Sequence, residues 1–138
     1  MSEATTRAAE YAAKYNKENA AIDVSGVSLT ERETQILWNF INGEWCGCYR
    51  QVADTETITA WDLRMLYSYS EDICGGVKNP SGVASSLNKN GLVESYTDKT
   101  HSEGPLDCMA LREAGTAKLV SLVNAATVAE RQKMLGRS

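Results

Sequence analysis

Hydrogen-bonding side chains are concentrated in residues 79–90, whose sequence is NPSGVASSLNKN. Serine and asparagine can hydrogen-bond to base edges, and lysine can contact phosphates. The N-terminus of a helix can also bind a phosphate through its free N–H groups. The chemistry of this segment therefore favours recognition of nucleic acid. The side chains that we expect to contact DNA are Lys78, Asn79, Ser81, Ser85, Ser86, Asn88, Lys89, Lys99, His101 and Arg112.

The net charge and the composition are less typical of a protein that binds nucleic acid. The chain has a net charge of −4 and a pI of about 5.0, whereas most nucleic-acid-binding domains are basic. Segment 79–90 contains no Arg, although Arg bound to guanine is the commonest specific contact. The alternative is that these polar side chains are a solvated helix face. A module that binds another protein and not DNA therefore stays open as a second hypothesis.

The four cysteines invite a metal interpretation. Cys46 and Cys48 would lie on the same face of a strand, and Cys74 and Cys108 would complete a set of four ligands. Structural zinc sites usually pair their cysteines at wider spacing. We therefore expect small, buried or half-buried reduced thiols and no metal or cofactor, with a zinc site or a redox-sensing pair as the alternative.

Catalytic chemistry is poorly represented in the sequence. His101 is the only histidine, and it lies in a polar stretch where nothing would hold it beside a nucleophile. Gly75 and Gly76 lack the surrounding motif of a phosphate-binding loop. We expect no enzyme activity.

Capping patterns divide the chain into helices. A Thr followed three residues later by Glu or Asp marks helix starts at Thr30, Thr59 and Thr127. Pro80 fits the first position of another helix, and Asn90-Gly91 fits its end. The ranges with a helical pattern are 3–21, 29–42, 59–68, 79–89, 112 onward and a short last helix from 127.

Alternating apolar residues predict a hairpin after the polar segment. The strands are expected at 92–96 and 106–111, joined by a polar tip that carries Lys99 and His101. Residues 45–58 have a broken β-like pattern and are expected to form an extended segment or short strand. Residues 69–78 are expected to form a connector.

Three sequence runs resemble the MarR-like branch of the winged helix-turn-helix superfamily. LTERE with Ile36-Leu37 resembles the opening of its first core helix. SLNKNGLVE, from Ser86, resembles the passage from its recognition helix into the wing. MALREAG, from Met109, resembles the passage from the wing into the next helix. The wing of that family carries a basic turn, where this chain has Asp-Lys-Thr-His, and residues 44–58 add length between its first two core helices.

The resemblance implies an α+β, mainly α fold with a two-stranded wing and extra N- and C-terminal helices. It implies a single domain with an N-terminal helix and loop at 1–28, a core at 29–123 and a C-terminal helix at 124–138. The implied function is sequence-specific binding of double-stranded DNA by a transcriptional regulator that uses the 79–90 helix and the 92–111 wing. The alternative is a winged-helix protein-interaction module, such as an adaptor or a phage or mobile-element regulator.

Two other partners are suggested. The N-terminal and C-terminal helices are candidates for a homodimer contact. The Trp- and Tyr-rich region 45–69 is a candidate surface for a protein partner. The first twenty residues lack the apolar core of a signal peptide, and no apolar run is long enough for a membrane span. We therefore expect a cytoplasmic protein with no membrane contact.

Overall fold

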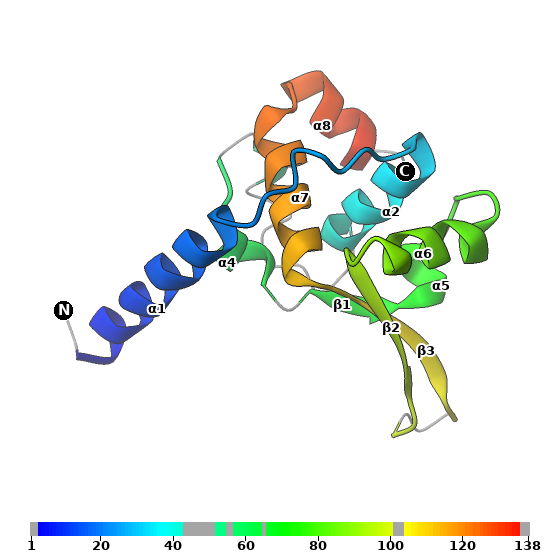
Figure 1. Ribbon diagram of the computed structural model, residues 1–138, viewed down its shortest axis with the longest axis horizontal. Helices are drawn as coiled ribbons and strands as arrows, with labels where there is room; N and C mark the ends of the chain where they lie inside the picture. Colours follow the sequence, from blue (N-terminus) through cyan, green and yellow to red (C-terminus); the bar gives the residue numbers. More distant parts are fainter. Residues whose placement is uncertain (1–2, 43–51, 55–56, 65, 101–103, 136–138) are drawn as a thin grey trace.

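The computed structural model describes residues 3–42, 52–54, 57–64, 66–100 and 104–135. Helices cover one face of a small sheet, and two parts, α1 and the β2–β3 hairpin, extend away from the body (Figure 1). This arrangement confirms the expected α+β, mainly helical class. The elements are α1 (Glu3–Ala20), α2 (Glu31–Asn42), α4 (Ala60–Leu63), β1 (Tyr67–Tyr69), α5 (Ser70–Ile73), α6 (Pro80–Lys89), β2 (Val93–Asp98), β3 (Leu106–Leu111), α7 (Glu113–Ala125) and α8 (Val128–Leu135).

The sheet is antiparallel with the strand order β1-β3-β2, so β3 is its central strand. Ser68 and Ser95 are paired with Met109 from the two sides, and Tyr69 and Tyr96 are paired with Cys108 in the next row. Because side chains alternate along a strand, the Met109 row and the Cys108 row face opposite sides of the sheet. The Met109 side faces the helices, and Met109 is buried there.

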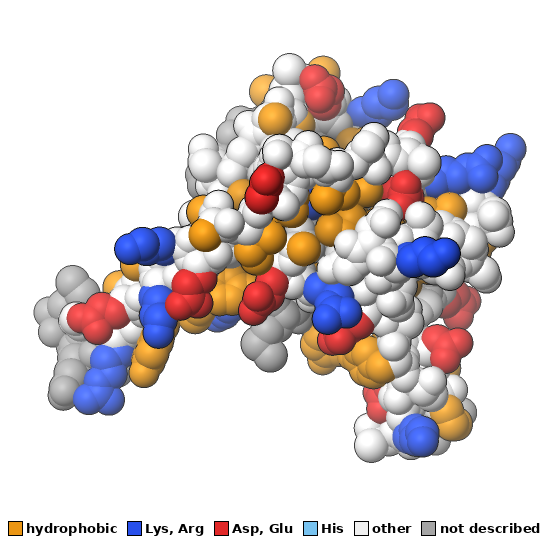
Figure 2. Space-filling view, viewed as in Figure 1, with side chains coloured by type: hydrophobic (Ala, Val, Ile, Leu, Met, Phe, Trp, Pro, Cys, Tyr) orange, Lys and Arg blue, Asp and Glu red, His pale blue; other side chains and the backbone are white. Residues whose placement is uncertain are grey.

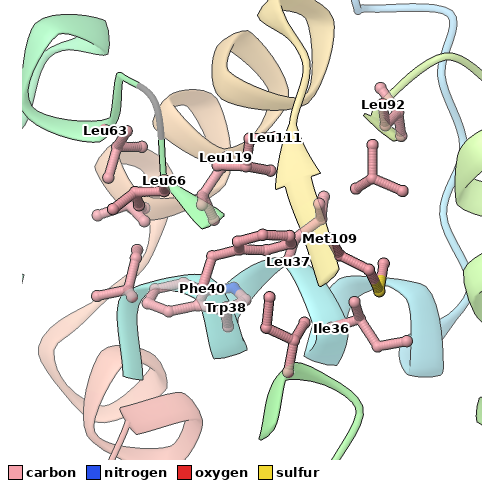
Figure 3. Close-up of a cluster of buried hydrophobic side chains, with 14 of the residues drawn as sticks. Ile36, Leu37, Trp38, Phe40, Leu63, Leu66, Leu92, Met109, Leu111 and Leu119 are labelled. Atoms are coloured by element: carbon pink, nitrogen blue, oxygen red, sulfur yellow. The ribbon is translucent and has the colours of Figure 1, made fainter. Parts of the chain in front are cut away.

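Helix α2 is the centre of the core. Its apolar residues Ile36, Leu37 and Phe40 are buried and face Met109 of β3 and Leu119 of α7 (Figure 3). Such residues recur every three to four positions, which places them on one side of a helix. Full burial of each large side chain contributes about 1.5–3 kcal/mol. The helix expected at 29–42 is confirmed.

The capping patterns are confirmed as local interactions. At the start of α2, Thr30 Oγ1 accepts from the N–H of Glu33 at 3.1 Å, and Glu33 Oε1 accepts from the N–H of Thr30 at 2.9 Å. At the start of α8, Thr127 Oγ1 accepts from the N–H of Glu130 at 3.2 Å. At α4, Asp62 Oδ2 accepts from the N–H of Thr59 at 2.8 Å.

Two expectations in the middle of the chain are wrong. The helix expected at 59–68 ends at Leu63, and 67–69 form strand β1. The connector expected at 69–78 contains the one-turn helix α5. In both places tertiary structure overrides the local sequence pattern. The second edge of β3 is free to pair with another strand, and β1 pairs there, next to a hydrogen bond from the N–H of Leu111 to Leu66 O at 3.0 Å. The aromatic residues of β1 also favour a strand.

The region expected to be extended is only partly described. Residues 52–54 form a helical turn, and Val52 is fully buried, so that part of the expectation is wrong. Within the same region, residues 45–51 and 55–56 lie outside the described residues.

The terminal helices are joined to the body in different ways. In α1, Tyr15 packs edge-on against Trp61 with ring centroids 5.6 Å apart, and Asn19 Nδ2 donates to Glu113 O at 3.0 Å. In α8, Leu135 joins the buried core, and Asn42 Nδ2 of α2 donates to Met134 O at 3.1 Å. The core thus extends past residue 123. A homodimer through these helices stays a prediction.

A close approach between α7 and the backbone of Leu92, the residue before β2, requires glycine at 115. A Cβ atom added there would collide with the backbone oxygen of Leu92. The same oxygen accepts a hydrogen bond from the N–H of Arg112 at 3.0 Å. We predict that Gly115→Ala lowers the free energy of unfolding by about 2 kcal/mol or more, because backbone must move to admit the methyl group.

Urea denaturation measures this effect, and Gly26→Ala is the control. Gly26 lies in an exposed loop with nothing near its added Cβ. We expect that variant to stay within about 0.5 kcal/mol of the wild type. Equal stability of the two variants would contradict the close packing of α7 on the backbone of Leu92.

Candidate functional site

Helix α6 is fixed to the body through one side and through its C-terminal end. Leu87 is fully buried and Val83 is half-buried against the core. At its end, the N–H of Leu92 donates to Leu87 O at 3.1 Å and the N–H of Gly91 donates to Asn88 O at 3.0 Å. This is a Schellman motif, and Gly91 has the positive φ of 76° that it requires. The predicted helix and its glycine stop are confirmed.

The start of α6 differs in detail from the expectation. Asn79 occupies the N-cap position and Pro80 the first helical position, as expected. Asn79, however, has left-handed backbone angles (φ 52°, ψ 54°) and its side chain makes no capping hydrogen bond. Asparagine tolerates this conformation better than most residues. Asn79 therefore shapes the entry into the helix through its backbone.

Ser86 connects α6 to α2. Its hydroxyl donates to Glu33 Oε2 at 3.0 Å, and Glu33 is only 5% exposed. The other oxygen of the same carboxylate, Oε1, accepts from the N–H of Thr30. Ser86 was expected to contact DNA, but its hydroxyl is used inside the fold. Ser86 therefore helps to position α6 against α2.

The opposite edge of α6 is exposed and polar. Ser81, Ser85, Asn88 and Lys89 are all exposed there. Together with Ser95 of β2 they border a hollow of about 470 Å³. The structure therefore brings these sequence-predicted residues together on one edge, beside the hairpin.

The remaining expected residues are spread around this edge. Lys78 is exposed just before α6, and Lys99 is exposed near the tip of the hairpin. Arg112 is exposed at the base of the hairpin, where it precedes α7. Strands of six residues separate Lys99 from Arg112 by about 17–20 Å. His101 lies outside the described residues.

Two carboxylates that sequence reasoning missed lie near this edge. Glu71 of α5 and Asp107 of β3 line one pocket with Ser81 of α6. They are distant in the sequence, so no local pattern indicates that they share a site. On the face seen in Figure 2, Lys and Arg side chains are separated from one another and have acidic neighbours. The α6 edge is therefore polar without a strongly basic surround.

The far side of the sheet is rich in tyrosine. Tyr67 is 59% exposed and Tyr96 is 43% exposed, and they lie on the same side as Tyr69 and Cys108. Burial raises the pKa of Tyr96 and Tyr69 above the usual value, and nearby Cys108 and Asp98 raise it further. These phenols are therefore neutral at pH 7.

The aromatic region 45–69 does not form one surface in the described part of the chain. Trp61 packs against Tyr15 of α1, and the guanidinium of Arg64 lies over its ring, 3.6 Å from the centroid. Tyr67 and Tyr69 lie on the sheet instead. The aromatic residues at 45 and 49 lie outside the described residues.

The described thiols are separated by the sheet. Cys74 Sγ lies 3.8 Å from Met109 Sδ on the helix side, and Cys108 is buried on the tyrosine side. Burial raises the pKa of both thiols, and for Cys108 the charge of Asp98 raises it further, so both are protonated at pH 7. In the described ranges no group of three or more His, Cys, Asp or Glu side chains could hold a metal ion. Cys46 and Cys48 lie outside those ranges.

Comparison with protein-family models, with curated proteins and with solved structures finds no match for the chain. Functional inference therefore depends on the arrangement of this chain's own residues. None of the described helices combines the length and the apolar character needed to cross a membrane.

The different roles of neighbouring serines can be separated by mutation. We predict that Ser86→Ala lowers the free energy of unfolding by about 1–3 kcal/mol, because it leaves an oxygen of the buried Glu33 carboxylate without its donor. Ser85→Ala is the matched control, since Ser85 is exposed, and we expect a change within about 0.5 kcal/mol. Thermal unfolding of the two variants measures both. A larger loss for Ser85→Ala would contradict the placement of Ser86 against α2.

Proposed function

We propose that residues 29–123 form a winged helix-turn-helix unit of a transcriptional regulator that binds double-stranded DNA. In this proposal α6 enters the major groove as the recognition helix, and the β2–β3 hairpin is the wing that contacts the adjacent backbone. Base contacts come from Ser81, Ser85 and Asn88. Phosphate contacts come from Lys78, Lys89, Lys99 and Arg112.

The order of the elements supports the proposal. After α2 and β1, helices α5 and α6 follow each other, and the hairpin follows directly. The sheet order β1-β3-β2 leaves β2 at the edge of the sheet, and α6 packs against it. In helix-turn-helix proteins the second helix reads the groove while the first crosses the backbone. Here α5 is a single turn, which leaves more of the positioning to α2.

The single observation that carries the proposal is the two-sided character of α6. Its inner side is fixed by buried Leu87 and by the bond from Ser86 to Glu33. Its outer edge presents Ser81, Ser85 and Asn88. A rigid helix with exposed hydrogen-bonding side chains can align them with base edges without first paying the entropy of ordering a loop.

Charge sets the strength of binding that we expect. The proposed phosphate contacts use at most Lys78, Lys89, Lys99 and Arg112. Glu71 and Asp107 lie beside Ser81 and would repel phosphates that approach the hairpin side of the helix. We therefore expect modest affinity for random DNA, with specificity for one sequence supplied by polar side chains of α6.

A salt titration tests the proposal. We expect the protein to bind random-sequence duplex DNA at low salt, with a slope of log K against log salt of about −4 or shallower, because each neutralised phosphate contributes about −0.9. Lys89→Ala should make the slope shallower by about 1 and weaken binding to all sequences alike. Fluorescence anisotropy of a labelled duplex at several salt concentrations measures both.

Lys14→Ala is the matched control. Lys14 is exposed on α1, which extends away from α6 and the hairpin (Figure 1). This variant should bind like the wild type. If the wild type shows no binding at low salt, or if Lys14→Ala weakens binding as much as Lys89→Ala does, the proposed interface is wrong.

A protein partner is the second candidate. The specific observation that favours it is the pair of carboxylates beside α6, since acidic groups suit a basic protein segment better than a phosphate backbone. In that case α6 and the hairpin would act as an adaptor surface. The same titration separates the two, because an adaptor of this kind shows no salt-dependent DNA affinity.

A further inference from the structure

A pocket of about 620 Å³ lies beside the hairpin, between α5, α6 and the strands β2 and β3. Its size is within the range of small-molecule sites, which is about 300–1,000 Å³. The walls come from four elements that are each fixed by the core or the sheet. The pocket is thus a formed feature of the folded chain.

The lining combines an apolar floor with acidic walls. Met109, Cys74 and Ala84 contribute apolar and sulfur surface, and the sulfur atoms of Met109 and Cys74 lie 3.8 Å apart. Glu71 and Asp107 contribute carboxylates from two different elements. No Lys or Arg among the described residues lines the pocket, and neither carboxylate forms a salt bridge with a residue that the structure describes.

This lining selects a class of ligand. An anion would be placed beside two carboxylates with no cation to offset them, which is electrostatically unfavourable. Thr97 Oγ1 donates to Asp107 Oδ1 at 3.4 Å, but this bond leaves the negative charge without a cation. A neutral apolar molecule would partly desolvate both carboxylates without offsetting their charge, which is also costly. A molecule with an apolar body and one cationic end fits both the apolar floor and the acidic walls. Its body would cover the sulfur atoms, and its positive charge would face the carboxylates.

We propose that the pocket between α5, α6 and the hairpin binds a small organic cation with an aromatic or other flat apolar body, held by Glu71 and Asp107 over a floor formed by Met109 and Cys74. The polarisable sulfur atoms suit an aromatic body, since sulfur–aromatic contacts are favourable. An amidinium or guanidinium end would match a carboxylate with two parallel hydrogen bonds. This site is independent of whether α6 binds DNA.

The test compares two probes of the same shape and opposite charge. The full-length ¹⁵N-labelled protein is titrated with benzamidinium and, separately, with benzoate, and amide chemical shifts are followed by NMR without DNA. We expect benzamidinium to shift the amides of Cys74, Ala84 and Met109 and to bind at least about tenfold more tightly than benzoate, since two carboxylates face the charge.

Variants identify the groups responsible. Glu71→Gln and Asp107→Asn should each weaken benzamidinium binding by about fivefold, because each removes one charge–charge interaction. Both residues are exposed, so neither change is expected to unfold the chain. Glu94→Gln is the matched control, since Glu94 is an exposed carboxylate of β2 that pairs with Ala110 and lies on the opposite side of the sheet.

Several results would overturn the proposal. They are equal affinity for the two probes, shifts that avoid the pocket residues, and a loss for Glu94→Gln as large as that for Glu71→Gln or Asp107→Asn. Ala84→Met gives a second check, because it fills the pocket with apolar volume and leaves both acids in place. Unchanged benzamidinium binding by a folded Ala84→Met variant would also contradict the site.

Discussion

A buried carboxylate determines how α6 is held. Glu33 begins α2 as part of its capping box, accepting from the N–H of Thr30, and it accepts a second bond from the hydroxyl of Ser86 on α6. A buried charge is costly unless it is hydrogen-bonded, so the carboxylate fixes the spacing between the two helices as well as the start of one. The orientation of the exposed edge of α6, and with it the proposed recognition surface, depends on this contact and on the packing of Leu87 against the core.

The charge around α6 limits what the surface can do. The helix offers hydroxyl and amide groups, whereas the neighbouring pocket offers carboxylates. Polar side chains without a basic surround give little non-specific attraction to DNA, so selectivity would come from hydrogen bonds to bases. The same carboxylates make the pocket beside the hairpin suitable for an organic cation. One set of elements therefore presents two adjoining surfaces of different chemistry, and Ser81 borders both.

Features set by neighbours in the sequence were predicted well. The caps at Thr30 and Thr127 and the glycine stop after Lys89 depend on contacts within a few residues. The strand Leu106–Leu111 was predicted from its own alternating pattern, although it is completed by pairing with β1 and β2. Strand β1 was not predicted, because it exists only by pairing with β3, about forty residues further along the chain. Likewise, the sequence placed the polar residues of α6 on a helix but did not show that Ser86 faces Glu33, or that Glu71 and Asp107 line one pocket with Ser81. Those facts depend on helix packing and sheet order, which a single sequence does not encode locally.

The most direct test of the central claim is to map where duplex DNA touches the protein. Amide chemical shifts of the ¹⁵N-labelled chain would be recorded at low salt with increasing amounts of a random-sequence duplex. We predict that the largest changes fall on the exposed edge of α6, at Ser81, Ser85, Asn88 and Lys89, with a second set near Lys99 in the hairpin. Changes confined to α1 or to the tyrosine side of the sheet, with α6 unaffected, would contradict it.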